Sequence, residues 1–319
     1  MPKLLITGGA GFIGGHTAKI AIQNGWKVRL FDNLSTGLKA RANGLECLGA
    51  EVIIGDVRDE ETVKAAIKGC DAVIHLAAQV SVPRSMEAPK ETFEINVGGT
   101  DNLLHACKIN GIARFVMASS AAVYGTNKAF PLDESHAGAF HSPYADSKWQ
   151  NEKQVLEAKA SGMEAVALRF FNVYGTGQRS DGAYAAVIPK FIELAVCGQA
   201  PTIFGDGLQT RDFVHVDDVA RALLMLATEP WTGDLEHVYN VCTETEISLL
   251  DLLSSIHIVL TDVAPEIPVP PPNYAGERAG DITRSIGSKA RLVNDTPWSP
   301  QVKFAQGLRQ QILDSIKDA

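Results

Sequence analysis

The sequence predicts an α/β protein in which a Rossmann-type, doubly wound parallel sheet is followed by a smaller mixed α/β domain. Short β-rich runs alternate with longer helical patterns up to residue 171, as in βαβ units. The first run leads straight into a turn with regularly spaced glycines, a feature of doubly wound sheets. After Asn172 the alternation stops and glycines divide the chain into loops and short elements, which indicates a second domain.

Six β-rich runs supply the predicted strands of the sheet. They are residues 3–7, 27–32, 51–55, 71–77, 114–120 and 164–171. Each is followed by a turn or a periodic segment, as the crossover connections of parallel strands require. We place residues 1–171 in this domain, expect its sheet to be completed by about residues 212–242, and assign residues 172–319 mainly to the second domain. There, a helix is predicted from about Phe304 to Ile316.

The composition narrows the classes of function. The 319 residues are 45% hydrophobic and 21% charged, which is typical of soluble globular proteins, and a net charge of −8 argues against a nucleic-acid partner. No apolar run approaches the roughly 20 residues that span a bilayer, and no secretory leader is recognisable, so we expect a cytoplasmic protein without membrane contact. The five cysteines are widely spaced without Cys/His clusters, which predicts reduced thiols and no metal site.

The glycine turn has the spacing of a dinucleotide-binding site. Gly8, Gly11 and Gly14 follow the first strand and open a helical pattern, where backbone N–H groups can approach a pyrophosphate. The next strand ends at Asp32, about 20 residues further on, where a carboxylate accepts hydrogen bonds from an adenosine ribose and repels a 2′-phosphate. We therefore expect NAD as the cofactor rather than NADP.

A tyrosine and a lysine are spaced one helical turn apart in the segment SPYADSK. Tyr144 and Lys148 stand at positions i and i+4, so their side chains lie on the same face of a predicted helix. By itself, this short spacing favours an ordinary pair on a charged helix surface, because charged helix faces are common.

Other motifs of the chain favour a functional interpretation of this pair. The segments TGGAGFIG, GDV, HLAAQ, NVGGT, SSAAVYG and YADSK together resemble the extended short-chain dehydrogenase/reductase family. The later segments RFFNVYG, FGDGLQTRDFVHVDDVA and ERAGD resemble its nucleotide-sugar branch, above all the UDP-hexose 4-epimerases. The resemblance covers residues 4 to about 282, and it implies that the second domain binds a UDP-sugar.

The resemblance implies three catalytic residues, Ser120, Tyr144 and Lys148. A free tyrosine has a pKa of roughly 10, but the Lys148 cation and the positive nicotinamide ring both favour the phenolate, so Tyr144 can act as the base. Lys148 would also bind the nicotinamide ribose, and Ser120 would bridge Tyr144 and the sugar hydroxyl. Ala121 and Ala122 stand where related dehydratases and decarboxylases carry acids, which favours epimerisation at C4 through a 4-keto intermediate.

The binding residues that the resemblance implies fall into two sets. NAD would contact Gly8, Gly11, Phe12, Ile13, Gly14, Asp32, Asn33, Asp56, Val57, Leu76, Ala77, Ala78, Gln79, Asn96, Ser119, Tyr144, Lys148 and Phe171. The UDP-sugar would contact Ser120, Asn172, Val187, Phe204, Arg211, Arg278 and Ser285. Two arginines suit a diphosphate because a guanidinium fork pairs with phosphate oxygens and stays charged.

The expected sugar depends on Ser285, the fourth residue after Asp281 of the ERAGD segment. In the epimerases, this position flanks the C2 substituent, and serine leaves room for an N-acetyl group. We therefore expect the UDP-N-acetylhexosamines to be epimerised at least as well as UDP-glucose and UDP-galactose. The chain after Asp281 is shorter than in relatives, so the alternative that Ser285 is a misaligned surface residue stays open.

Three other functions stay open at this point. A UDP-glucuronate 4-epimerase needs a cation near the C6 carboxylate, and Arg179 is the candidate. Another family member that modifies nucleotide sugars is the second alternative. A non-catalytic NAD-sensing regulator is the third, although such proteins typically lose the tyrosine or the lysine that this chain keeps.

Two further features follow from the resemblance. Family helices equivalent to residues 89–110 and 142–161 commonly pair across a two-fold axis, so we expect a homodimer with Trp149 and Leu156 as apolar contacts. In addition, Gly15 replaces the serine that is usual after the FIG segment of the glycine turn. The sequence alone gives this replacement no consequence.

Overall fold

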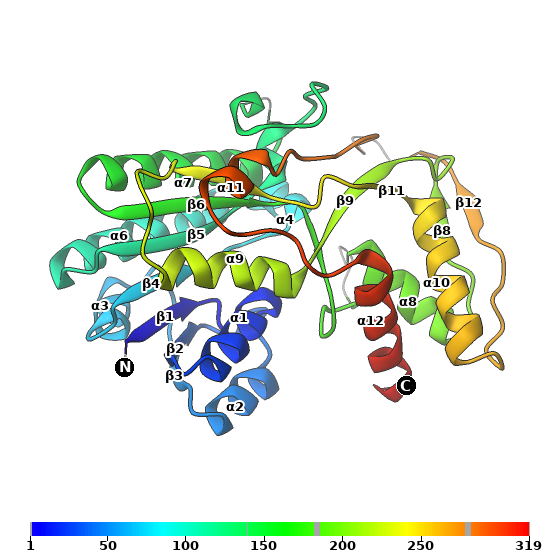
Figure 1. Cartoon of the computed structure of the whole chain (residues 1–319), viewed down its shortest axis with the longest axis horizontal. Helices are drawn as coiled ribbons and strands as arrows, with labels where there is room; N and C mark the ends of the chain where they lie inside the picture. Colours follow the sequence, from blue (N-terminus) through cyan, green and yellow to red (C-terminus); the bar gives the residue numbers. More distant parts are fainter. Residues whose placement is uncertain (1, 139, 182–185, 278–281, 319) are drawn as a thin grey trace.

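A seven-stranded parallel sheet forms the larger part of the protein (Figure 1). The computed structural model describes residues 2–138, 140–181, 186–277 and 282–318. The strands lie in the order β10-β6-β5-β4-β1-β2-β3, and every neighbouring pair is parallel. They are β1 Lys3–Thr7, β2 Lys27–Asp32, β3 Glu51–Ile54, β4 Ala72–His75, β5 Arg114–Ser120, β6 Glu164–Phe170 and β10 Val238–Val241. The strand order reverses between β1 and β4, which is the point where doubly wound sheets bind ligands at the carboxyl ends of their strands.

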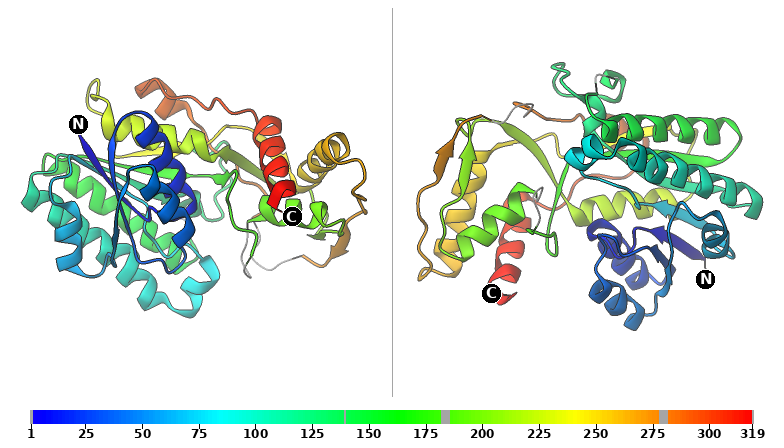
Figure 2. Two further views of the ribbon diagram at one scale, coloured as in Figure 1. Left: turned by 90° about the horizontal axis from the view of Figure 1, so that it is seen from below. Right: turned by 180° about the vertical axis from the view of Figure 1, so that it is seen from behind.

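Helices cover both faces of this sheet, so its strands are apolar on both sides. Leu4 and Ile6 of β1 face one core together with residues of α1 and α9, whereas Leu5 faces a second core with residues of α3, α6 and α7. Figure 2 shows these layers from below and from behind. The first layer is α1 Phe12–Gln23, α2 Lys39–Cys47 and α9 Val216–Thr228, and the second is α3 Glu60–Ile67, α6 Gly99–Asn110 and α7 Pro143–Ala160.

Short elements connect the strands near the carboxyl edge of the sheet. Helices α4 Val82–Glu87 and α5 Pro89–Phe93 and the π-helical turn η1 Glu94–Gly98 lie between β4 and α6. The 3₁₀ turns η2 Ala121–Tyr124 and η3 Glu134–His136 lie between β5 and α7.

A second, smaller unit begins where the chain leaves β6. It contains a three-stranded sheet in the order β11-β9-β7 and a two-stranded sheet of β12 and β8. The strands are β7 Asn172–Tyr174, β8 Thr202–Phe204, β9 Thr210–His215, β11 Glu246–Ser248 and β12 Asn273–Ala275. The helices α8 Val187–Val196, α10 Leu249–Val263 and α12 Phe304–Asp318 share a core with residues of β7, β8, β9 and β11, and the short α11 Ala290–Asp295 lies against β10. Because β7 follows the carboxyl end of β6, this unit stands at that edge of the main sheet (Figure 1).

The predicted fold class, a doubly wound sheet with a smaller second unit, is confirmed. Within residues 212–242, β10 pairs with β6 in the main sheet, whereas β9 pairs with β7 and β11 in the small sheet. The domain boundary after residue 171 stays a prediction. Across the described ranges, no helix is both long enough and apolar enough to cross a membrane.

Candidate active site and cofactor cradle

The glycine turn between β1 and α1 is built by contacts that leave no room for side chains. Gly8 has a φ of +66°, and a Cβ there would lie 2.8 Å from the backbone nitrogen of Ala77. A Cβ on Gly14 would lie 2.2 Å from the carbonyl oxygen of Gly8. Helix α1 begins at Phe12. Its N-cap residue, Gly11, provides no side-chain cap, and its first turn contains no acidic residue. The first N–H groups of α1 are therefore available to an anion.

Asp32, at the end of β2, fixes the loop that faces this turn. Its carboxylate accepts hydrogen bonds from the backbone N–H groups of Ala10 at 3.0 Å and Leu34 at 2.8 Å. The neighbouring Asn33 donates to the carboxylate of Asp56 after β3, at 2.9 Å. The structure therefore brings three of the predicted cofactor residues to adjacent carboxyl ends of β2 and β3.

The segment after β4 is fixed by Asn96. Its side chain accepts a hydrogen bond from the Gln79 N–H at 2.8 Å and donates to the Gln79 carbonyl at 3.0 Å. The same amide donates to the hydroxyl of Ser147 on α7, at 2.9 Å. Asn96 lies in the π-helical turn η1, and it ties the strand end that carries Ala77 to the helix that carries Tyr144.

His75 has a structural role in the same region. Its ring nitrogens lie 2.7 Å from the hydroxyl of Thr7 and 3.0 Å from that of Thr100. Burial, followed by the nearby charge of Lys148, lowers the pKa of His75 to about 3. The ring is therefore neutral at physiological pH, and both of its nitrogens are occupied by side chains of the core.

The predicted catalytic residues come together from β5 and α7. Ser142 caps α7 and Pro143 occupies its first turn, which places Tyr144 and Lys148 on successive turns of one face. Ser120, the last residue of β5, lies close enough to the Tyr144 phenol to lower its pKa. The Nζ of Lys148 donates to the carbonyl of Ala118 at 3.0 Å. The surface-pair interpretation of Tyr144 and Lys148 is wrong, since both side chains are buried.

Burial sets the electrostatics of this pair. It raises the pKa of the Tyr144 phenol, and the hydrogen bond with Ser120 offsets part of the increase. Burial also lowers the pKa of Lys148 to about 8, while the charge of Glu152, one turn further along α7, acts in the opposite direction. The tuning of Tyr144 by the Lys148 charge stays a prediction.

A buried ion pair lies behind these residues. Glu152 accepts two hydrogen bonds from the guanidinium of Arg169 on β6, at 2.8 and 2.7 Å, and one from the hydroxyl of Ser119 at 2.5 Å. The side chains of Glu152 and Arg169 are 3% and 1% exposed. Since Ser119 precedes the predicted relay residue Ser120, this ion pair fixes the end of β5 against α7.

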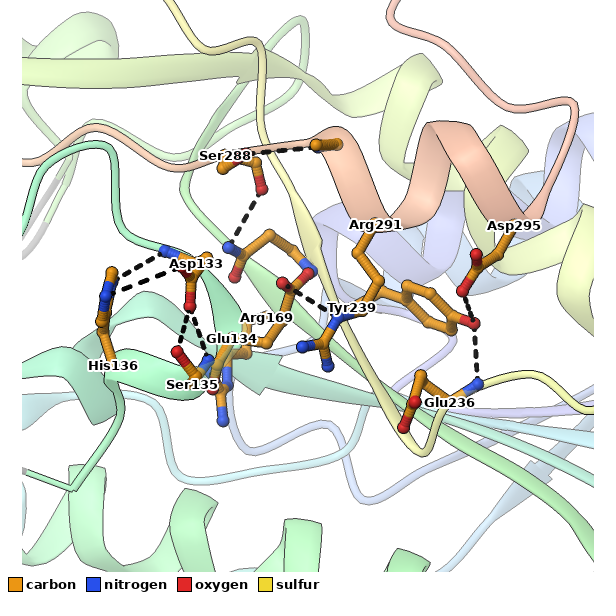
Figure 3. A network of polar contacts seen from close by, with 12 residues as sticks. Asp133, Glu134, Ser135, His136, Arg169, Glu236, Tyr239, Ser288, Arg291 and Asp295 are labelled. Atoms are coloured by element: carbon orange, nitrogen blue, oxygen red, sulfur yellow. Dashed lines mark hydrogen bonds and ion pairs between the residues drawn. The ribbon is translucent and has the colours of Figure 1, made fainter.

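The network continues from Arg169 to the edge strand β10. Arg169 donates to the Tyr124 hydroxyl at 2.9 Å, and Tyr124 donates to Asn240 on β10 at 2.6 Å. The backbone N–H of Asn240 donates to the buried carboxylate of Glu134 at 2.8 Å. Glu134 also pairs with Arg291 of α11 at 3.3 Å, as Figure 3 shows. Sequence reasoning missed this network, and its one visible signal was an arginine inside an otherwise apolar strand.

The predicted sugar-binding residues lie on the second unit. Asn172, Val187 and Phe204 stand at the ends of β7, α8 and β8, and Arg211 lies on β9. Arg278 lies outside the described residues. The backbone of Ser285 donates to the carbonyl of Thr210, next to Arg211, at 3.1 Å.

Two residues after Ser285, the chain packs against the end of the main sheet. A Cβ on Gly287 would lie 2.4 Å from the ring of Phe171, which directly follows β6. The segment that carries Ser285 therefore runs between β9 and the carboxyl edge of the main sheet.

Residues 4–242 match the NAD dependent epimerase/dehydratase family. This chain belongs to that family. Among the described residues of this family member, no group of three or more His, Cys, Asp or Glu side chains is placed to hold a metal ion.

Several relatives match this member of the family along almost its whole length. A putative UDP-glucose 4-epimerase of Methanocaldococcus jannaschii is 37% identical over 312 residues, 97% of each chain. The UDP-N-acetylglucosamine 4-epimerase of Methanobrevibacter ruminantium, solved with UDP-N-acetylmuramic acid, has a TM-score of 0.90 at 34% identity and covers 100% of this chain and 99% of its own. The UDP-glucose 4-epimerase of Thermus thermophilus, solved with NAD, has a TM-score of 0.84 at 33% identity and covers 98% of both chains.

Removal of Arg169 tests how far the buried ion pair supports the fold. Arg169→Met leaves the Glu152 carboxylate buried without its partner, so we expect the free energy of unfolding to fall by about 3–5 kcal/mol. The double variant Arg169→Met/Glu152→Leu removes both charges and should recover most of this loss. Urea denaturation with linear extrapolation measures both values.

The matched control is Arg309→Met, because Arg309 pairs with Asp262 on the surface, where ion pairs contribute less than about 1 kcal/mol. A double variant as unstable as Arg169→Met would contradict the interpretation, since the loss would then come from packing and not from an unpaired carboxylate.

Proposed function

We propose that this chain is an NAD-dependent UDP-hexose 4-epimerase that oxidises C4 of the sugar to a ketone and reduces it again from the opposite face. The observation that carries the proposal is the buried placement of Tyr144 and Lys148 on one face of α7, next to Ser120 at the end of β5. These residues lie at the carboxyl edge of a sheet whose first turn is an anion cradle. Membership of the NAD-dependent family and the epimerases among its relatives support the same conclusion.

The residues of the cradle fit NAD. The side-chain-free turn at Gly8 and Gly14 suits a pyrophosphate, and Asp32 at the end of β2 suits the adenosine ribose. NAD, when bound, accepts the electron pair from C4 and later returns it. Ser119, Phe171 and the segment from Leu76 to Gln79 complete the proposed cofactor contacts.

Tyr144 is the proposed general base. The phenol takes the proton of the C4 hydroxyl, with Ser120 as the bridge, and gives it back when the ketone is reduced. Because burial raises the pKa of Tyr144, the phenolate forms only when positive charge stands nearby. Lys148 supplies such charge from the same helix face, and it also orients the nicotinamide ribose.

The surroundings of Ser120 favour epimerisation over elimination or decarboxylation. Ala121 and Ala122 form the turn η2 next to Ser120, and a methyl group cannot move a proton at C5. The buried carboxylates nearby are occupied, since Glu152 binds Arg169 and Glu134 binds Asn240. The remaining reaction of the 4-keto intermediate is therefore its reduction, in which the electron pair returns to C4.

In the proposed complex, residues of the second unit bind the UDP part of the substrate. Arg211 and Arg278 bind the diphosphate, and Asn172, Val187 and Phe204 line the uridine side. Arg179 is paired with Asp181, with its Nε 2.7 Å from the carboxylate, so the arrangement does not favour it as a ligand for a C6 carboxylate. UDP-glucuronate is therefore a weaker candidate than the neutral sugars.

We also propose a homodimer, formed through the helices α6 and α7. Leu156 on α7 and Ile109 on α6 are 46% and 60% exposed, which suits an apolar contact. Trp149 instead packs within its own chain. Its ring centroid lies 6.1 Å from that of Phe140, and the guanidinium of Arg169 lies over its ring. A cytoplasmic location stays a prediction from the sequence.

Tyr144→Phe tests the proposed function. The wild type should interconvert UDP-N-acetylglucosamine and UDP-N-acetylgalactosamine, and the variant should lose turnover by about 10²–10⁴-fold, because only the ionisable oxygen is removed. Chromatography of the sugar products measures turnover, and calorimetry should show unchanged binding of NAD. Tyr274→Phe is the control, because the side chain of Tyr274 is 60% exposed. This variant should keep the turnover of the wild type. The proposed function is wrong if the wild type produces no C4 epimer from either acetylated or plain UDP-hexoses.

Ser120→Ala tests the proton relay through the pH profile. Loss of the Ser120 hydrogen bond should raise the pKa of Tyr144, and the base acts only when deprotonated, so the rising limb of kcat/KM should move to higher pH. The activity lost relative to wild type should therefore shrink as the pH increases. Ser120→Thr keeps the hydroxyl and should retain the wild-type profile. A loss that is the same at every pH would argue for a purely structural Ser120.

Ser285→Tyr tests the proposed choice of sugar. A tyrosine at this position should fill the space that an N-acetyl group needs, so kcat/KM for UDP-N-acetylglucosamine should fall at least about tenfold more than that for UDP-glucose. Ser285→Ala keeps the space and should keep the acetylated sugars as substrates. If Ser285→Tyr uses the acetylated sugars undiminished, the selectivity lies elsewhere in the second unit.

A further inference from the structure

Gly15, in the first turns of α1, makes room for a side chain from α2. A Cβ on Gly15 would lie 2.3 Å from the Cδ of Arg41, which is far closer than two carbons can approach. The side chain of Arg41 therefore occupies the space above the start of α1. A serine at position 15 would displace it.

Arg41 connects the glycine turn to the second unit. Its Nη1 donates to the carbonyl of Ala10 in the turn at 3.1 Å, and its Nη2 donates to the carbonyl of Gly177, beyond β7, at 2.8 Å. Both acceptors are neutral. A guanidinium has five N–H donors, so these two bonds leave three for a further ligand.

The charge of Arg41 is not matched by an acid on the described parts of the chain. Its hydrogen bonds to described residues go to carbonyl oxygens, and no ion pair joins it to a described carboxylate. Burial lowers the pKa of Arg41, and the like charge of Arg179 lowers it further, while Asp32 has the opposite effect. Asp32 itself accepts from backbone N–H groups of Ala10 and Leu34. A partly buried guanidinium whose hydrogen bonds go to carbonyl oxygens is suited to an anionic ligand, because hydrogen bonds between opposite charges are stronger.

The start of α1 presents the complementary feature. Its first N–H groups have no side-chain cap, and Arg41 is bonded to the residue directly before the N-cap Gly11. Backbone donors and a guanidinium fork thus stand side by side. This combination suits a diphosphate, whose oxygens accept from several donors at once.

We propose that Arg41 is a further cofactor-binding residue, that it contacts the diphosphate of NAD, and that Gly15 serves to admit it. This inference rests on the proposed binding of NAD at the glycine turn. It assigns the ligand to the diphosphate and not to the adenosine, because the adenosine ribose faces Asp32, a carboxylate.

Calorimetry on the full chain, freed of nucleotide, tests the proposal. Adenosine, ADP and NAD are titrated into the wild type and Arg41→Met. Charge-assisted hydrogen bonds are strong, so Arg41→Met should weaken ADP and NAD about 10- to 100-fold and leave adenosine unchanged. Lys39→Met is the matched control, because it removes an exposed cation from the same helix and should change each affinity less than about twofold.

Gly15→Ser gives an independent test that keeps the arginine. The added side chain should push Arg41 aside and reduce the affinity for ADP selectively, as Arg41→Met does. The proposal is overturned if Arg41→Met binds ADP like the wild type, or if adenosine is weakened as strongly as ADP. A wild type that binds neither NAD nor ADP would instead refute the cofactor site itself, and with it the proposed function.

Discussion

The buried ion pair between Arg169 and Glu152 is the constraint on which the geometry of the proposed catalytic residues depends. The proposed base and its relay come from different elements, α7 and β5, and nothing in the local sequence fixes their separation. Glu152 of α7 fixes this separation, because it accepts hydrogen bonds from Ser119 at the end of β5 and from Arg169 on the neighbouring strand β6. Two opposite charges in a dry interior hold each other firmly, because neither can exchange its partner for water.

The same network explains why a strand from the later chain returns to the main sheet. β10 brings Asn240, which binds the Tyr124 hydroxyl through its side chain and the Glu134 carboxylate through its backbone. Its amide also donates to the carbonyls of Leu132 and Ser288, so the segment just after Ser285 is attached to the turn after β5. The position of the proposed sugar-selecting residue and that of the proposed relay are therefore set by one connected group of buried polar side chains.

The sequence predicted those features that depend on local patterns. Alternating runs predicted the sheet, the glycine spacing predicted the tight turn before α1, and the i, i+4 spacing predicted that Tyr144 and Lys148 share one face of a helix. Their proposed catalytic role came from the family resemblance. Contacts between distant residues were not predictable. Arg169 is a lone arginine in an apolar run, and its partner Glu152 stands on a preceding helix, so no local pattern joins them. The consequence of Gly15 likewise depends on a side chain from another helix, Arg41. The placement of β9 outside the main sheet was hidden for the same reason, because strand pairing is decided by tertiary contacts.

The uncapped start of α1 has a consequence for the life of the protein in the cell. The N-cap Gly11 offers no capping side chain, so a dinucleotide bound there as proposed would satisfy the first N–H groups of α1 and would stabilise the fold as well as take part in the chemistry. By mass action, a ligand present at 100 times its dissociation constant adds about 2.7 kcal/mol to the stability of the native state. Typical domains are stable by only about 5–15 kcal/mol, so this is a substantial share. Under the proposed function, the resistance of the chain to proteolysis would therefore rise with the concentration of free dinucleotide around it.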